Sequence, residues 1–169
     1  MKKIIYAFLF FSVACTPPKQ KGLIFFNDFE SIKGWASVCL SKKVVHSGIY
    51  SNQLDSTHVY GESFKAVFKE ISEDKVVKVK VSFWTFMNPD AQGDLVVEIK
   101  KPDLSTAMWT AKKLSEIAPK IGKWQEVQAE FTFPDSALKS VNTICIYPWN
   151  VSKGTFYVDD FRLEFVQGY

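Results

Sequence analysis

The stretch KVVKVKVSFWTFM, residues 75–87, decides the fold class of this chain. Apolar residues occupy every second position in it: Val77, Val79, Val81 and Phe83. The positions between them belong to the opposite face: Lys78, Lys80, Ser82, Trp84 and Phe86. A period of two over this length predicts a β-strand with one face in the core.

Further runs along the chain alternate in the same way, and turn sequences rich in Gly, Pro, Asn and Asp separate them. The runs cover residues 95–101, 124–133, 141–149 and 155–165. Only residues 114–121 resemble a helix, and Pro119 limits that segment to one turn. Many short strands with 15% aromatic residues predict an all-β chain folded as an antiparallel β-sandwich, with a jelly roll as the expected topology.

The N-terminus has the anatomy of a secretory signal: Lys2 and Lys3, a short apolar run over residues 4–11, and small residues before Cys15. Val-Ala-Cys resembles the lipobox of bacterial lipoproteins, so we expect a signal peptide over residues 1–14 and lipidation of Cys15. The alternative is an ordinary signal peptide cut near Ala14. Residues 15–21 then form a lipidated tether, and residues 22–169 form the β-sandwich domain.

The charge of the chain limits the classes of partner, and its cysteine content bears on a possible disulfide. Removal of Lys2 and Lys3 lowers the formal net charge from +3 to +1, which argues against a nucleic-acid partner. Of the three cysteines, Cys15 is the one expected to be lipidated. Cys39 and Cys145 are free to pair in an oxidising compartment, although buried or half-buried thiols are the default expectation.

Five segments in a fixed order carry a family resemblance: FNDFES followed by GW (26–35), VVHSGIYSNQL (44–54), VKVSFWTFM (79–87), GKWQEVQAEFTFP (122–134) and FYVDDFRLEF (156–165). Together they resemble the jelly-roll carbohydrate-binding modules attached to xylanases and cellulases, within the galactose-binding-like superfamily. The resemblance runs from about Leu23 to Phe165. It implies that Trp35 and Trp124 are packing residues and that His46 belongs to a structural turn.

The same resemblance implies a structural calcium ion where the first and last strands lie side by side. Calcium takes six to eight oxygen ligands. The expected carboxylates are Glu30 and Asp159, with Asp28 and Asp160 as alternates, and carbonyls of Ser47 and Gly48 complete the expected shell. The alternative interpretation is that the adjacent acids merely mark a solvated strand edge.

The alternation also predicts a ligand site on outward-facing residues. Aromatic rings in modules of this kind stack on sugars, and polar groups beside them bind the hydroxyls. The candidate set is Trp84, Phe86, Tyr147 and Trp149 for stacking, with Glu98, Lys100 and Asn150 for hydrogen bonding. The alternative is that residues 102–122 fold over these rings and make a second small core.

No catalytic or zinc-binding motif stands out, so we expect a protein that is not an enzyme. The expected function is that of a lipoprotein in the bacterial cell envelope that binds a glycan or oligosaccharide. The alternative is an adaptor lipoprotein that holds a protein partner on the same sandwich. The lipid is expected in the outer membrane, with the periplasmic and surface sides both open.

Overall fold

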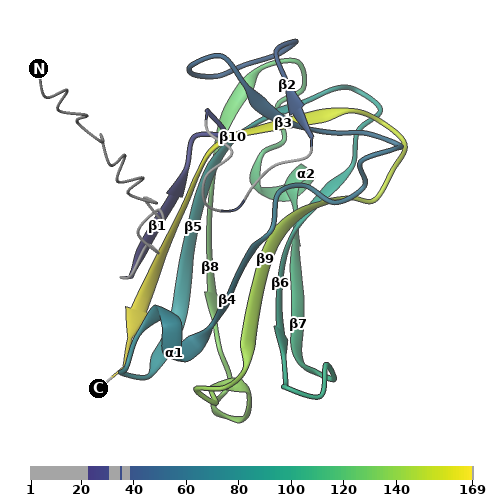
Figure 1. Cartoon of the computed structure of the whole chain (residues 1–169). Helices are drawn as coiled ribbons and strands as arrows, with labels where there is room; N and C mark the ends of the chain where they lie inside the picture. The colour runs from purple at the N-terminus through teal and green to yellow at the C-terminus, as the bar shows by residue number, and fades with distance from the viewer. Residues whose placement is uncertain (1–22, 31–34, 36–38, 169) are drawn as a thin grey trace, which may run out of the picture.

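The computed structural model describes residues 23–30, 35 and 39–168. The predicted signal peptide, Cys15 and the tether lie outside these residues. The described part folds as two antiparallel β-sheets packed face to face (Figure 1). The all-β class and the sandwich predicted from the alternating runs are therefore confirmed. Among the described residues, no helix has the length and apolar character that a membrane span requires.

Sheet A contains the first and last strands of the domain. Its strands are β1 (Ile24–Asn27), β2 (Leu40–Ser41), β3 (Ser51–Leu54), β5 (Val76–Met87), β8 (Trp124–Thr132) and β10 (Phe156–Gln167). Their order is β2-β3-β10-β5-β8, and β1 pairs with β10. Strand β10 is long enough to pair with β3 through residues 156–158 and with β1 through residues 161–164. The first and last strands thus lie side by side, as the resemblance implied.

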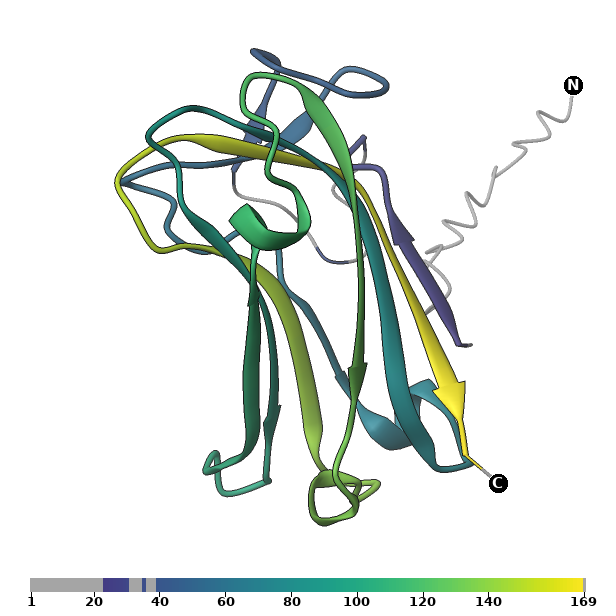
Figure 2. The ribbon, with the colours of Figure 1, turned by 180° about the vertical axis from the view of Figure 1, so that it is seen from behind.

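Sheet B covers the other side of the sandwich with four strands, seen from behind in Figure 2. These are β4 (Phe64–Val67), β6 (Gly93–Lys100), β7 (Thr106–Lys113) and β9 (Thr143–Asn150), in the order β4-β9-β6-β7. Short helical turns connect strands: α1 (Phe68–Ile71), α2 (Leu114–Ile117) and the 3-10 turn η1 (Asp135–Ala137). The single turn α2 matches the prediction, whereas α1 was not foreseen.

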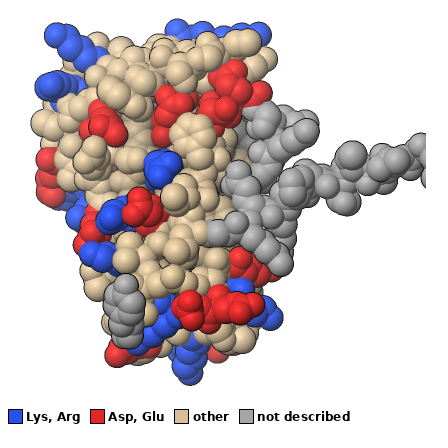
Figure 3. Space-filling model, turned by 90° about the vertical axis from the view of Figure 1, so that its left-hand side faces the viewer, with Lys and Arg blue, Asp and Glu red and all other residues tan. Residues whose placement is uncertain are grey.

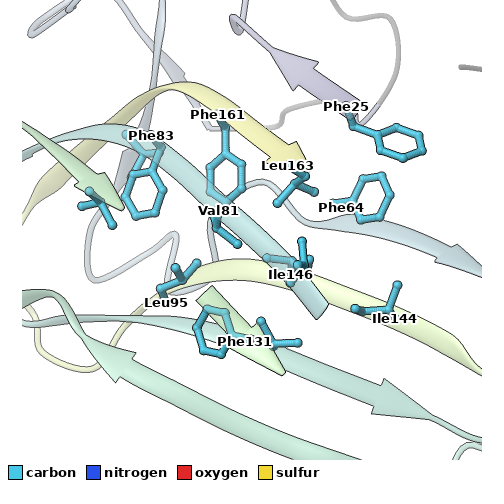
Figure 4. Close-up of a cluster of buried hydrophobic side chains, with 14 of the residues drawn as sticks. Phe25, Phe64, Val81, Phe83, Leu95, Phe131, Ile144, Ile146, Phe161 and Leu163 are labelled. Carbon is cyan, nitrogen blue, oxygen red and sulfur yellow. The ribbon is translucent and has the colours of Figure 1, made fainter. Parts of the chain in front are cut away.

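The core fills the space between the sheets with the apolar members of the alternating runs (Figure 4). Phe83 of β5 stacks on Phe161 of β10, with ring centroids 4.9 Å apart and planes inclined by 3°. Trp35 packs edge-on against Phe161 and Phe64, so it is a packing residue, as expected. Burial of these rings is the main driving force for the fold, at about 25 cal/mol per Å² of apolar surface.

The two remaining cysteines do not form a disulfide. Cys39 is buried beside β3, and Cys145 is half-buried on β9 of sheet B. Burial raises the pKa of both thiols. They are therefore inert thiols of the kind expected by default.

Candidate functional site

The predicted ligand residues lie on two opposite surfaces of the sandwich. Trp84 and Phe86 lie on β5, on the outer face of sheet A, while Tyr147 and Trp149 lie on β9, on the outer face of sheet B. All four point away from the core, as their phase predicted. Because the core separates the two faces, these residues cannot contact one ligand together. The single predicted site is corrected to two separate aromatic clusters.

The cluster on sheet A is covered by the chain itself. His46, from the loop between β2 and β3, stacks on Trp84 with centroids 3.9 Å apart and planes inclined by 14°. Its edge also faces Trp124, which in turn contacts Phe86. The covering segment is this loop, residues 42–50, rather than residues 102–122. Trp84, Phe86 and Trp124 therefore form a small satellite core, and we remove Trp84 and Phe86 from the ligand site.

Acidic residues of the first and last strands hold this loop in place. The Asp159 carboxylate accepts hydrogen bonds from the backbone N–H groups of His46 (2.9 Å) and Ser47 (3.2 Å). The Glu30 carboxylate accepts from the N–H groups of Ile49 (2.8 Å) and Tyr50 (2.9 Å). These bonds bracket Gly48, whose φ of 65° is strained for any residue with a side chain.

A β-bulge in β10 turns both aspartates toward the loop. The register of β10 against β5 shifts between Asp159 and Arg162, and Asp160 adopts a φ of 51°. Asp160 accepts from the Ser47 hydroxyl (2.9 Å) and lies 2.8 Å from the His46 ring. In a regular strand, Asp159 and Asp160 would point to opposite faces. The extra residue in the bulge breaks this alternation, so both side chains point toward the loop.

Burial raises the pKa of the Asp159 carboxyl to about 6, although the N–H donors of His46 and Ser47 oppose this shift. The folded pKa thus lies above the usual value, so the folded state favours the protonated form. The stability that this group contributes is lost as the pH rises through about 6.

The calcium site stays a prediction. Glu30 and Asp159 face the predicted loop, but the oxygens described above accept backbone N–H groups. Asp28 accepts the backbone N–H of Glu30 at 3.0 Å. Within the described ranges, no three His, Cys, Asp or Glu side chains are grouped so that they could hold a metal ion.

A strip of four aromatic side chains crosses the outer face of sheet B. Tyr60 precedes β4 and bridges to Trp149 of β9, and their rings are nearly parallel, inclined by 17° with centroids 6.3 Å apart. Tyr60 also meets Tyr147 edge-on at 5.8 Å. Trp109 of β7 completes the strip on the far side. Tyr60 and Trp109, at its two ends, are 59% and 50% exposed.

The middle of the strip lies between strands that are not neighbours. Burial raises the pKa of Tyr147 on β9, and the Trp109 indole, reaching across β6 from β7, opposes that rise. Val96 of β6 lies between these two strands on the same face and is fully buried. Tyr60, Tyr147 and Trp149 are in ring contact, Trp109 lies across Val96 on the same outward face, and Tyr60 and Trp109 keep half or more of their surface exposed.

Polar groups border the strip. Glu98 lies opposite Trp109 on β6, and its carboxylate is 3.4 Å from the Lys100 ammonium. Both point outward, as predicted. Asn150 does not belong to the site, because it is 2% exposed and its amide donates to the Gly154 carbonyl at 2.8 Å. Alternation already required this, since Asn150 follows the outward-facing Trp149.

Tyr60 was missed because it follows a loop rather than a strand. The Asp55 carboxylate accepts from the backbone N–H groups of Thr57 (2.8 Å) and His58 (2.9 Å), which closes a tight turn. The chain after this turn runs along β9, where Gly61 donates to the Pro148 carbonyl at 2.9 Å. Only the turn residues in DSTHVYG were a sequence signal for this arrangement.

The outer face of sheet A also adjoins a hollow of about 420 Å³. Its lining is Lys80, Val81, Ser82, Lys112, Gln128, Ala129, Glu130, Arg162 and Glu164. No aromatic ring lines it, and Lys80 pairs with Glu164 at 3.1 Å. Figure 3, viewed from the side of β1, shows acidic and basic groups interspersed on this surface. It lacks the stacking groups that sugar rings require.

The fold is similar to that of solved xylan-binding modules of family 22. The CBM22-1 domain of Paenibacillus barcinonensis Xyn10C has a TM-score of 0.56 at 15% identity, covering 86% of this chain and 95% of that one. The CBM22-2 domain of the same protein has a TM-score of 0.57 at 18% identity, covering 84% and 99%. The C-terminal family 22 module of Clostridium thermocellum Xyn10B has a TM-score of 0.58 at 11% identity, covering 83% and 91%.

These likenesses establish the jelly-roll fold of carbohydrate-binding modules for this chain. By sequence, no family model matches it, and no curated protein does.

Proposed function

We propose that the aromatic strip of sheet B binds a polysaccharide or oligosaccharide chain. The observation that carries this proposal is the set of four rings on one uncovered sheet face, with Tyr60 and Trp109 half or more exposed at its ends. Exposed aromatic surface of this extent is normally covered by a ligand or a partner. Binding of xylan by the modules described above supports a glycan as that ligand.

We propose that the protein binds this chain without cleaving it. The two acids of β6 on this face, Asp94 and Glu98, are four residues apart on one strand. At about 3.3 Å per residue their separation is roughly 13 Å. Glycosidases place their paired carboxyl groups about 5–9.5 Å apart, so these two acids do not form such a pair.

The binding test is a glycan array with the purified chain, followed by titration calorimetry on each glycan found. The substitutions Trp149→Ala and Trp109→Ala should each weaken binding, whereas Trp84→Ala should leave it unchanged. Binding that is lost with Trp84→Ala and kept with Trp149→Ala would move the site to sheet A. An array without a single glycan bound refutes the proposal.

We further propose that Cys15 is acylated and that residues 16–21 tether the domain to the outer membrane. The Val-Ala-Cys sequence after a short apolar run supports this. Mass spectrometry of the protein from membranes should find the lipid on Cys15, and Cys15→Ser should release the protein into the soluble fraction. An unmodified N-terminus beginning at Cys15 would contradict the proposal.

We also keep the structural calcium as a proposal. A fully buried Asp159 beside Asp160, both directed at the loop 42–50, is an arrangement that a cation would stabilise. Calcium at 100 times its dissociation constant would add about 2.7 kcal/mol to the free energy of unfolding. The melting temperature should therefore rise in calcium relative to a chelator. Equal melting temperatures in the two solutions would remove calcium from this fold.

A further inference from the structure

One end of the outer face of sheet B differs chemically from the aromatic strip. Thr143 and Cys145 precede Tyr147 on strand β9 and share its outward face. Cys145 lies opposite Lys65 of β4, and Thr143 lies opposite Lys100 of β6. Two small side chains therefore form a floor with a lysine on each side of it.

The charges around this floor do not cancel. Lys100 is paired with Glu98 at 3.4 Å, and Glu98 also accepts from the Thr106 hydroxyl at 3.3 Å. Among the described residues, no carboxylate lies within ion-pair distance of the exposed Lys65. Two ammonium groups against one carboxylate leave a local charge of +1 from these three residues. Lys65 and Glu98 lie opposite Cys145 on the two neighbouring strands, and Lys100 lies opposite Thr143 beside Glu98. All three charged groups act on the Cys145 thiol, which places them near the same point.

The distance between this floor and the strip suits a sugar chain. Cys145 lies two residues from Tyr147 on one strand, about 6.6 Å away at 3.3 Å per residue. That distance is of the order of one sugar unit. A chain stacked on Tyr147 and Trp149 would therefore carry its next unit, or a side group, over the floor between the two lysines.

We propose that the glycan is acidic and that a uronic-acid carboxylate lies over Cys145 and Thr143, between Lys65 and Lys100. The inference rests on the proposed function, because the rings must first hold the chain. Two ammonium–carboxylate pairs of about 0.2–1 kcal/mol each give a preference between about twofold and about thirtyfold, with about five- to tenfold at the middle of that range. Salt weakens this attraction but leaves ring stacking largely intact.

The experiment compares acidic polymers with their own neutral forms. Glucuronoxylan, polygalacturonate and alginate are each titrated onto the purified full chain before and after reduction of the carboxyl groups to alcohols. At least one acidic polymer should bind about five- to tenfold more tightly than its reduced form. Added salt at about 0.5 M should abolish most of that difference. Lys65→Gln should lower the affinity for the acidic polymer and leave that for the reduced polymer unchanged.

Lys80→Gln is the matched control, since it removes an exposed lysine from the outer face of sheet A. It should leave every affinity unchanged. Equal affinities for acidic and reduced polymers, with Trp149→Ala still weakening both, overturn the acidic preference and keep the glycan site. If neither the polymers nor any glycan on the array binds, the proposed function fails together with this inference.

Discussion

The outer faces of the two sheets carry aromatic clusters of similar size, but only one cluster is open. On sheet A, the loop 42–50 lies over Trp84, and the Glu30 and Asp159 carboxylates hold it there. On sheet B, Tyr60 and Trp109 end a strip that leaves its rings in contact with solvent. The difference teaches that a ring on the outward face of a strand is not always exposed to a ligand. On sheet A the ring is covered because backbone N–H groups of a neighbouring loop donate to carboxylates, and these bonds fix the loop over the ring.

The strongest test of this comparison is Trp84→Ala. Its removal leaves a hole under His46, and large-to-small changes of aromatic residues in cores cost about 3–5 kcal/mol. Because Trp84 is only half-buried, we expect a loss of about 2–3 kcal/mol in the free energy of unfolding. Denaturant titration measures it. A stable Trp84→Ala variant would mean that the loop does not depend on this ring.

The corresponding substitution on the outer face of sheet B, Trp149→Ala, should lower glycan affinity and have little effect on stability. We expect glycan affinity to fall by about 30-fold, equivalent to about 2 kcal/mol, because a central aromatic residue dominates such a surface. Titration calorimetry gives the affinity, and the melting temperature should change little. Unfolding of this variant would place the ring in the core and remove the site.

Gly48→Ala should weaken the closed face without replacing any ring. The left-handed φ of 65° costs a non-glycine residue about 1–2 kcal/mol, and an added Cβ would overlap the Glu30 carboxylate. We expect the melting temperature to fall while glycan affinity stays unchanged. Gly122→Ala is the control, since its φ is also positive, at 67°, but no atom lies within 4 Å of an added Cβ. Equal losses in both variants would mean that backbone strain alone, without the Glu30 contact, accounts for the effect.

The smallest expected effect concerns the turn that precedes Tyr60. Burial alone would raise the pKa of Asp55, but hydrogen bonds from Thr57, His58 and Gln53 outweigh it and hold the pKa well below its usual value. A depressed folded pKa means that the stability contributed by Asp55 is present above about pH 4 and is lost as the pH falls. Thermal melts from about pH 5 down to pH 2 should show this loss.

Asp55→Asn should cost about 1 kcal/mol at neutral pH and flatten the acid side of that profile. A variant with the wild-type acid profile would show that other carboxyl groups govern acid unfolding. Glycan binding reports separately whether the turn positions Tyr60, and a fall in affinity is expected with this variant.

The sequence was sufficient for the sandwich and for the direction of most side chains, since alternation reports both. Trp84, Tyr147, Trp149, Glu98 and Lys100 all point outward as predicted. Alternation does not report which sheet a strand joins, because that depends on pairing between distant segments. For this reason Trp84 of β5 was grouped with Tyr147 of β9, although the two strands belong to different sheets.

Irregular backbone accounts for the other differences. The bulge at Asp160 turns both aspartates to one side, and a second shift near Ile99 and Lys100 alters the pairing of β7 at the end that precedes Trp109. Tyr60 comes from a turn without strand periodicity. Each of these positions is set by hydrogen bonds between segments, and local periodicity does not encode such bonds.

The place of β1 also bears on the proposed glycan site. Because β1 pairs with β10 in sheet A (Figure 1), the described part of the domain begins on the sheet that does not carry the aromatic strip. The two sheets are separated by about 10 Å of packed core. A domain held through its N-terminus thus turns the strip away from its attachment point. Under the proposed anchoring through Cys15, the proposed glycan chain can lie across Tyr60, Trp149 and Trp109 without colliding with the membrane.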